Sequence, residues 1–159
     1  MGVARRGGSE AEFRDFLDDA EPRLRRGLVA GFGIQSGEDA TADAIAFAWE
    51  HWVRLREMDN PVGYLFRVGQ TSGRRSMRPS AMGMITPEAS TQPAVEPGLP
   101  EAIASLSENQ RICTLLVHGA GWTLSEVADL LSVHPGTIAK HVERGLNKLR
   151  SELGVATDA

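Results

Sequence analysis

The stretch from residue 123 to residue 150, TLSEVADLLSVHPGTIAKHVERGLNKLR, limits the possible fold of this chain more than any other. Thr123 followed by Glu126 is typical of a capping box, in which each side chain satisfies a free backbone N–H at a helix start. Apolar residues then recur at helical spacing up to Leu131. After a short break, Pro135 suits the first position of a new helix, because its missing N–H has no intrahelical partner there. The stretch therefore predicts two helices joined by a very short turn.

Two short helices with such a connection form a helix-turn-helix motif. The second helix of this motif can enter the major groove of DNA. Residues 135–150 carry four basic side chains and one acidic side chain. Ala128 is small enough for a close helix crossing, and the apolar Val133 could fill the core at the turn. Ser132 is a departure, since glycine adopts a left-handed turn with less strain. An ordinary helical hairpin with a solvated basic face is the alternative, and DNA binding is the favoured interpretation.

Composition places the chain among globular proteins that do not insert into membranes. It has 159 residues, of which 42% are hydrophobic and 24% charged. No apolar run approaches the roughly 18 residues of a membrane span, and the N-terminus lacks a secretory hydrophobic region. Cys113 is the single cysteine, so an intrachain disulfide is impossible. These features favour a cytoplasmic location.

Charge is unevenly distributed along the chain. The formal net charge is −4, although residues 63–79 hold four arginines and no acidic residue. Local potential, more than net charge, determines where a phosphate backbone is attracted. The basic segments therefore favour nucleic-acid binding, and the acidic remainder is compatible with an additional protein partner.

The first part of the chain predicts a long amphipathic helix followed by a loop. Ser9 and Glu12 form another candidate capping box at its start. Pro22 should kink this helix or restart it, because proline removes one hydrogen bond and clashes with the preceding turn. The glycines near residues 31–37 favour a loop there.

A second helix is expected from about residue 38 to residue 58. On its apolar face Trp49 is expected to be a core residue, while Trp52 could equally lie in the core or contact DNA. Asn60 followed by Pro61 combines a good helix cap with a proline at the first helical position. A third helix should therefore start there.

A change of composition divides the chain in two. The segment from residue 80 to residue 98 is rich in proline and lacks lysine and arginine, which is typical of an extended linker. Beyond it, Ser107 with Gln110 forms a third candidate capping box. No strand pattern is convincing. We therefore expect an all-α fold with helical units at 1–78 and 99–159, joined by a flexible linker at 79–98.

Both units together resemble the bacterial ECF (extracytoplasmic-function) sigma factors, with their region 2 and region 4 domains. The resemblance covers roughly residues 10–153. Its most specific parts are NPVGYLFRV at residues 60–68 and GTIAK at residues 136–140. It implies a non-catalytic protein without a metal or cofactor. The implied partners are core RNA polymerase and promoter DNA, with an anti-sigma factor as a further candidate.

The resemblance also implies three groups of site residues. The residues matching the face that reads the minus-thirty-five element are Pro135, Gly136, Thr137, Lys140, His141, Arg144 and Lys148. Those matching the part that captures and helps melt the minus-ten element are Trp52, Tyr64, Arg67, Arg74, Arg75 and Arg78. Those matching the segment that docks on polymerase are Glu38, Asp39, Asp43 and Phe47. A duplex suits a helix in the major groove, whereas an opened strand suits aromatic and cationic side chains.

Two departures from the family pattern concern the first unit. Residues 68–73, VGQTSG, stand where an alanine, an asparagine and an aspartate are usual, and each of the two glycines lowers helix propensity by about 1 kcal/mol relative to alanine. The usual glutamine–glutamate pair of the polymerase-docking helix is replaced by residues 42–44, ADA.

Two other functions remain as alternatives. A helix-turn-helix regulator could use the first unit to bind another protein without supporting initiation; the NPVGYLFRV segment favours the sigma interpretation. An enzyme is disfavoured, because the cysteine and histidines lack metal-ligand spacing and no glycine-rich phosphate loop follows a strand.

Overall fold

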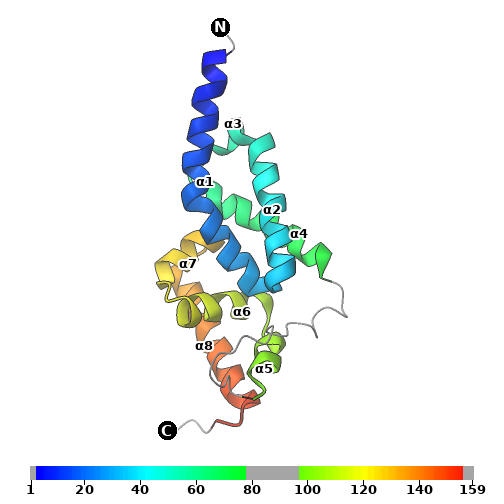
Figure 1. The fold of residues 1–159 in the computed structure, drawn as a ribbon. Helices are drawn as coiled ribbons and strands as arrows, with labels where there is room; N and C mark the ends of the chain where they lie inside the picture. Colours follow the sequence, from blue (N-terminus) through cyan, green and yellow to red (C-terminus); the bar gives the residue numbers. More distant parts are fainter. Residues whose placement is uncertain (1–2, 78–96, 156–159) are drawn as a thin grey trace.

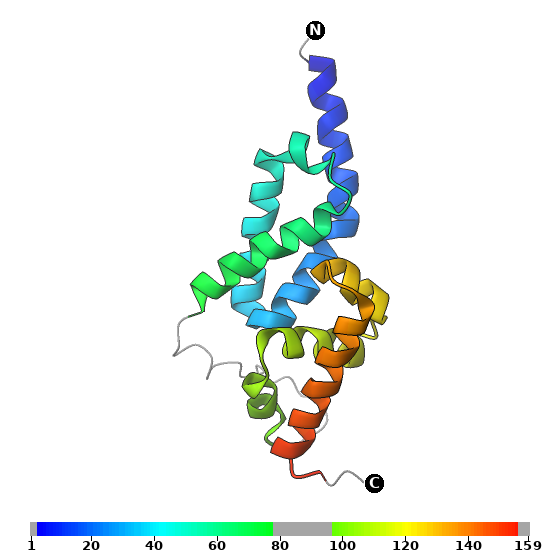
Figure 2. The same ribbon diagram turned by 180° about the vertical axis from the view of Figure 1, so that it is seen from behind.

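The computed structural model describes residues 3–77 and 97–155, with side chains from residue 9 onward. Within these ranges every regular element is a helix, so the predicted all-α fold class is confirmed. Residues 3–77, here called the first unit, contain α1 (Val3–Phe32), α2 (Ile34–Glu50), α3 (Trp52–Leu55) and α4 (Pro61–Ser76). Residues 97–155, the second unit, contain α5 (Leu99–Ser105), α6 (Glu108–Thr114), the π-helical turn η2 (Leu115–Gly119), α7 (Leu124–Leu131) and α8 (Pro135–Glu152). Figures 1 and 2 show α1, α2 and α4 at one end of the molecule and α5 to α8 towards the other.

Helix α1 differs from the sequence prediction at both ends. It begins at Val3, so Ser9 lies inside the helix and does not cap its start. Pro22 also lies inside and does not restart the helix, although Figure 1 shows α1 changing direction partway along its length. The predicted loop near residues 31–37 is wrong, because the connection to α2 is Gly33 alone. Its φ of 83° is a left-handed conformation that glycine adopts without strain.

The predicted second helix is interrupted at His51. Helix α2 ends at Glu50, and the short α3 follows it. His51 has a φ of −115° and lies outside both helices. Its imidazole stacks on the ring of Phe47, with centroids 4.1 Å apart, and its Nδ1 lies 2.9 Å from the Phe47 carbonyl oxygen. These contacts stabilise the break between α2 and α3.

Helix α4 begins as predicted, at a side-chain cap followed by proline. The Asn60 side-chain oxygen accepts a hydrogen bond of 2.9 Å from the Gly63 N–H, and Pro61 occupies the first helical position. Later in the helix, Gly69 and Gly73 face α1. A Cβ at Gly69 would lie 2.6 Å from a Leu28 methyl carbon. The departure from the family pattern therefore allows α4 to approach α1 closely.

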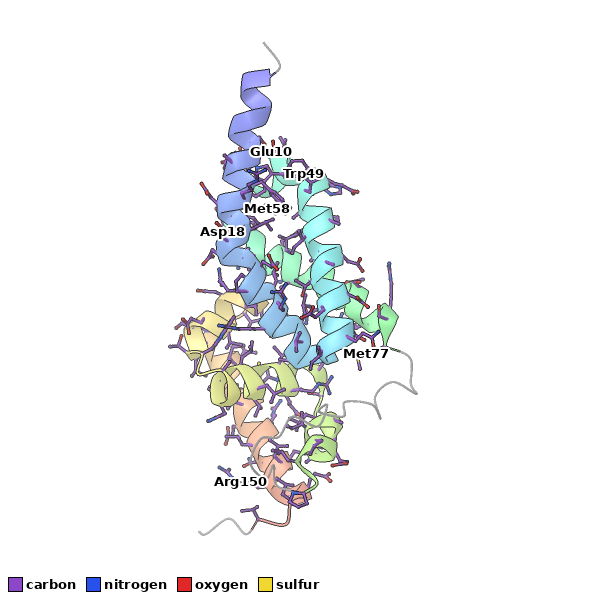
Figure 3. The ribbon with its side chains drawn as sticks, viewed as in Figure 1. Glu10, Asp18, Trp49, Met58, Met77 and Arg150 are labelled. Atoms are coloured by element: carbon purple, nitrogen blue, oxygen red, sulfur yellow. The ribbon has the colours of Figure 1, made fainter. Side chains whose placement is uncertain are left out.

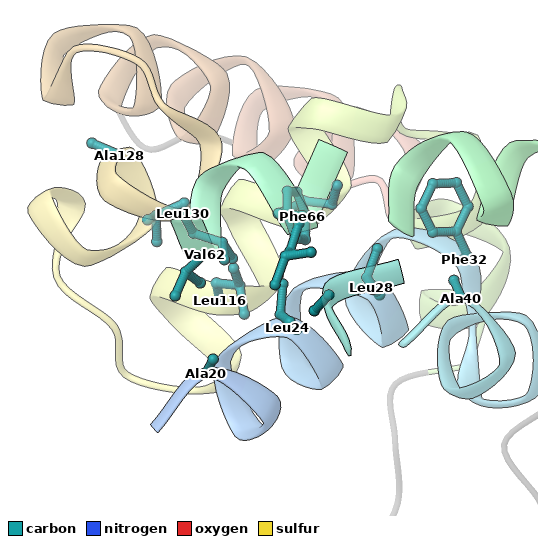
Figure 4. Packing of buried hydrophobic residues seen from close by; sticks show 14 of the residues in the cluster. Ala20, Leu24, Leu28, Phe32, Ala40, Val62, Phe66, Leu116, Ala128 and Leu130 are labelled. Atoms are coloured by element: carbon teal, nitrogen blue, oxygen red, sulfur yellow. The ribbon is translucent and has the colours of Figure 1, made fainter. Parts of the chain in front are cut away.

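The two units share one hydrophobic core. Its buried members include Leu24, Leu28 and Phe66 from the first unit, and Ile112 and Leu130 from the second. Figure 4 shows Leu24 and Phe66 of the first unit near Leu116 and Leu130 of the second. The predicted linker falls almost wholly at residues 78–96, outside the described residues, so the division into domains stays a prediction.

Candidate nucleic-acid interface

The helix-turn-helix is formed by α7, a three-residue turn and α8. Thr123 and Glu126 make the predicted capping box: the Thr123 N–H donates to the Glu126 carboxylate over 2.7 Å, and the Glu126 N–H donates to the Thr123 hydroxyl over 3.1 Å. The Thr123 hydroxyl also donates to the Glu126 carboxylate, over 3.1 Å. The hydrogen bonds that this carboxylate accepts from the Thr123 N–H and hydroxyl lower the pKa of Glu126, because they stabilise its charged form. Ser132 ends α7 with φ 56°, which confirms the left-handed turn inferred from the sequence.

The second helix starts at a cap that the sequence analysis missed. The His134 imidazole Nδ1 accepts a hydrogen bond of 3.0 Å from the Gly136 N–H, and Pro135 follows as the first helical residue. Val133 does not fill the core as suggested, because it is 40% exposed. The turn is therefore held by its backbone and by the His134 cap.

Helix α8 separates its core side from its solvent side. Ile138, Val142 and Gly145 are buried, and a Cβ at Gly145 would lie 2.3 Å from the Thr114 hydroxyl of α6. This close crossing orients the opposite side of α8 outward. The predicted upstream-element residues of α8 are all exposed or half-buried, namely Pro135, Gly136, Thr137, Lys140, His141, Arg144 and Lys148.

Lys148 differs from the other cations of this helix. Its ammonium donates to the Ser105 carbonyl oxygen at the end of α5, over 2.5 Å. A cation near the carbonyl end of a helix is favourably placed for the helix dipole. Lys148 thus connects α8 to α5, whereas Lys140 and Arg144 are exposed in the first part of α8.

The two tryptophans near the end of α2 differ in burial. Trp49, expected in the core, is 55% exposed, so that prediction is wrong. Trp52, a candidate DNA contact, is only 5% exposed and packs against Phe13 and Phe16 of α1, with ring centroids 5.2 and 5.0 Å away. The break at His51 changes the direction of the chain between them. Figure 3 shows Trp49 at the same end of the molecule as Glu10.

The remaining predicted downstream-element residues lie on α4, apart from Arg78, which is outside the described residues. Tyr64 is half-buried, and Arg67 and Arg75 are exposed. Arg74 forms a bidentate ion pair with Glu108 of the second unit, with nitrogen–oxygen distances of 3.1 and 2.6 Å. The pKa of Arg74 is raised, chiefly by this hydrogen bond. The cation best held in position on α4 thus has a carboxylate as its partner.

The predicted polymerase-docking residues lie on α2. Glu38, Asp39 and Asp43 are exposed and Phe47 is half-buried. A shallow groove of about 480 Å³ between α2 and α4 is lined by Asp43, Phe47, Val68, Thr71, Ser72, Arg75 and Ser76. Within it, the Ser72 hydroxyl donates to the Asp43 carboxylate. The groove therefore places two predicted polymerase-docking residues beside Arg75, a predicted DNA contact.

Arg111 was not identified from the sequence. It is 3% exposed, and its guanidinium donates to the Gly31 carbonyl over 3.0 and 2.7 Å and to the Leu106 carbonyl over 3.0 Å. Burial lowers its pKa, because removal from water disfavours the charged form. No sequence signal indicates this role, since the Gly31 carbonyl is distant in the chain.

The described residues offer neither a cluster of metal ligands nor a membrane-spanning helix. Among them, no group of three or more histidine, cysteine, aspartate or glutamate side chains is placed to hold a metal ion. None of the helices described combines the length and apolar character that a membrane span requires.

The all-α fold and the helix-turn-helix define a class of proteins that contact duplex DNA through one helix. Within that class, residues 98–149 match the family described as Sigma-70, region 4. One similar solved structure is the sigma factor RpoE from Bartonella quintana, in a complex with the anti-sigma factor NepR. The two chains are 22% identical, the match covers 92% of this chain and 99% of that chain, and the TM-score is 0.60. These findings confirm the resemblance to sigma factors. No curated protein sequence matches the chain.

Proposed function

We propose that this protein is an ECF sigma factor, which binds core RNA polymerase and directs it to promoters. The observation that carries the proposal is the exposed recognition surface of α8, within the segment that matches the family described as Sigma-70, region 4. Thr137, Lys140 and Arg144 lie on this surface. The fold shared with RpoE along most of both chains supports the assignment of the first unit as region 2.

The two units have different tasks in this proposal. The second unit reads the duplex upstream element through α8, in the manner of other recognition helices. The first unit contacts the opened downstream element with Tyr64, Arg67, Arg74 and Arg75 on α4, where stacking and phosphate neutralisation bind an unpaired strand. The acidic and apolar side chains of α2 bind polymerase. The protein performs no catalysis itself and acts in the cytoplasm. An anti-sigma factor is a further partner, supported by the RpoE–NepR complex.

Charge reversal on α2 tests the polymerase contact. Asp39→Lys with Asp43→Lys should lower the affinity for purified bacterial core RNA polymerase about tenfold, because like charges would meet in the interface. Asp15→Lys with Asp18→Lys on the exposed side of α1 is the matched control and should bind like the wild type. Affinity is measured by fluorescence titration, and run-off transcription on genomic fragments follows.

Unchanged affinity in the α2 variant would contradict the docking role of these aspartates. If the wild-type chain binds specific duplexes but neither binds core polymerase nor supports run-off transcripts, the protein is a helix-turn-helix regulator instead of a sigma factor.

A further inference from the structure

His134 is an exposed residue at the junction between the turn of the helix-turn-helix and α8. Its imidazole Nδ1 accepts a hydrogen bond of 3.0 Å from the Gly136 N–H, and its carbonyl oxygen accepts one of 2.9 Å from the Thr137 N–H. Both donors belong to the first turn of α8, at the end of a recognition helix that usually meets DNA. His134 is therefore held beside Thr137, a predicted upstream-element residue.

The cap determines which ring nitrogen of His134 carries the proton. A backbone N–H only donates, so Nδ1 is the acceptor, and in the neutral imidazole the proton lies on Nε2. The two ring nitrogens of an imidazole point in different directions, so the Nε2–H is directed away from Gly136. Among the described residues, the Gly136 N–H is the single hydrogen-bond partner of this imidazole. An exposed donor at Nε2 is therefore left for a ligand.

Gly136 makes room for this arrangement. An added Cβ would lie 3.1 Å from Nδ1 and 3.5 Å from Cε1 of His134. The shorter distance is tighter than an ordinary van der Waals contact, so a side chain at residue 136 would displace the imidazole. The cap by His134 and the glycine at residue 136 thus depend on each other.

The surroundings of the imidazole favour an anion. Residues 134–141 contain Lys140 and no acidic side chain, and both Thr137 and Lys140 are exposed. The positive end of the α8 dipole lies at the same place. Duplex DNA presents a phosphate at every nucleotide, and helix starts and side-chain donors are common partners of these phosphates.

We propose that His134 is a further DNA contact of this protein, which caps α8 through Nδ1 and donates its Nε2–H to a backbone phosphate of the upstream duplex. The inference rests on duplex recognition by α8, which is part of the proposed function. The contact fixes the first turn of α8 against the sugar–phosphate backbone, so that Thr137 and Lys140 meet the base edges in a defined register. Because every sequence carries phosphates, the contact contributes affinity and no base preference of its own.

Two substitutions separate the cap from the phosphate contact. In His134→Asn the side-chain oxygen takes the place of Nδ1, whereas the amide nitrogen ends one atom short of Nε2. Asparagine is a favourable N-cap residue, so this variant keeps the cap and loses the phosphate donor. In His134→Gln the amide nitrogen reaches the place of Nε2, while no acceptor remains at Nδ1. His118→Asn is the matched control, because His118 is also exposed and lies on η2, outside the helix-turn-helix.

Affinity is measured at about pH 8, where histidine side chains are ordinarily neutral, with a duplex that the holoenzyme selects from a random pool. We expect His134→Asn to bind this duplex and its single-base variants about 5- to 20-fold more weakly, with a melting temperature within about 1 °C of the wild type. The slope of log affinity against log salt should not change, because a neutral imidazole releases no counterion. His134→Gln should bind within about threefold of the wild type but melt about 2–4 °C lower. The control should match the wild type in both measurements.

Methylphosphonate substitution of the duplex identifies the phosphate. It replaces one charged phosphate at a time by a neutral group that has one oxygen fewer. At one position the loss of affinity should be about 5- to 20-fold smaller for His134→Asn than for the wild type, because the variant has no contact to lose there. A partly unfolded variant would instead lose affinity for every duplex alike, so this comparison decides even if asparagine lowers the melting temperature.

The remaining outcomes would overturn the contact. They are wild-type affinity of His134→Asn, equal losses for the wild type and this variant at every methylphosphonate position, and a loss confined to particular base pairs, which would indicate a base contact. The sigma function is decided separately by binding to core polymerase. If that binding fails, the same measurements are made with the full-length chain alone, because the contact requires only duplex recognition by α8. A wild type that selects no duplex would overturn both that recognition and the contact at His134.

Discussion

Single residues decide how closely the helices of this protein approach one another. Gly73 lies on the face of α4 that contacts α1, where an added Cβ would be 2.6 Å from the Phe32 ring. Phe32 is itself buried, so its ring has little room to move. The same glycine lowers the intrinsic helix propensity of α4. At this position the close contact between helices outweighs propensity.

Gly73→Ala should therefore destabilise the protein, even though alanine is the better helix former. The gain in propensity is about 1 kcal/mol, and overpacking a buried contact costs about 1–3 kcal/mol. We expect a net loss of about 1 kcal/mol in the free energy of unfolding, measured by urea denaturation. Gly119→Ala is the control, because nothing lies within 4 Å of an added Cβ there. A stabilised Gly73→Ala variant would show that Phe32 moves aside easily.

The capping box of α7 makes a pH-dependent contribution. The pKa of Glu126 is lowered in the folded chain by its hydrogen bonds with Thr123. A lowered folded-state pKa means that the stabilisation is present above the unfolded pKa, about 4.3, and is lost as the pH falls through the folded value. Between pH 6 and pH 3 the melting temperature of the wild type should fall more steeply than that of Glu126→Gln. Parallel profiles would contradict a role for the Glu126 charge.

At the scale of elements, α8 separates positioning from base reading along its length. Its first turns carry Thr137 and Lys140, at the end that usually meets base edges in this motif. Arg144 lies one turn beyond Lys140 and is likewise exposed. The buried Ile138 and Val142 orient both basic side chains to the outside of the second unit.

Two alanine variants test this division. Arg144→Ala should weaken binding to all duplexes and reduce the salt dependence by about one phosphate contact. Lys140→Ala should relax preference at one position of the upstream element, with a loss of roughly 1–3 kcal/mol of discrimination if the contact is bidentate to guanine. Both variants are measured against single-base variants of the upstream element at several salt concentrations. A uniform loss from Lys140→Ala, with altered base preference from Arg144→Ala, would reverse the assignment.

For the whole molecule, the buried Arg111 connects two units that a proline-rich segment separates in sequence. Its guanidinium satisfies the Gly31 carbonyl near the end of α1 and the Leu106 carbonyl before α6. Because all these groups are removed from water, loss of the donors leaves carbonyl oxygens unpaired. The cost of an unpaired buried acceptor exceeds the net gain from making an ordinary hydrogen bond.

Arg111→Met should lower the free energy of unfolding by about 2–3 kcal/mol. It should also make the unfolding of the two units less cooperative. Methionine keeps the apolar volume of the side chain but cannot donate the hydrogen bonds to the Gly31 carbonyl that join the units. Tryptophan fluorescence and circular dichroism, followed in urea, should give one transition for the wild type and a broader transition for the variant. An unchanged midpoint would show that water replaces the guanidinium at little cost.

The sequence by itself determined the local structure of the second unit and the start of α4. The capping boxes at Thr123 and Ser107 and the Asn60 cap involve residues at most three positions apart. Their hydrogen bonds therefore depend on local backbone geometry, which sequence spacing reveals. The resemblance to sigma factors came from similarly local segments, and the match of residues 98–149 to sigma-70 region 4 agrees with it.

The tertiary structure alone decided which faces are buried. Periodicity could not distinguish Trp49 from Trp52, because the break at His51 redirects the chain between them. From their propensity, the glycines near the end of α1 predicted a loop, and those of α4 predicted a weak helix. In the structure they lie where neighbouring helices leave no room for a side chain. The contacts Asn60–Ser132, Arg74–Glu108 and Arg111–Gly31 join residues far apart in the chain. Such pairings depend on how the helices pack in three dimensions, and the spacing of residues in one sequence does not encode that packing.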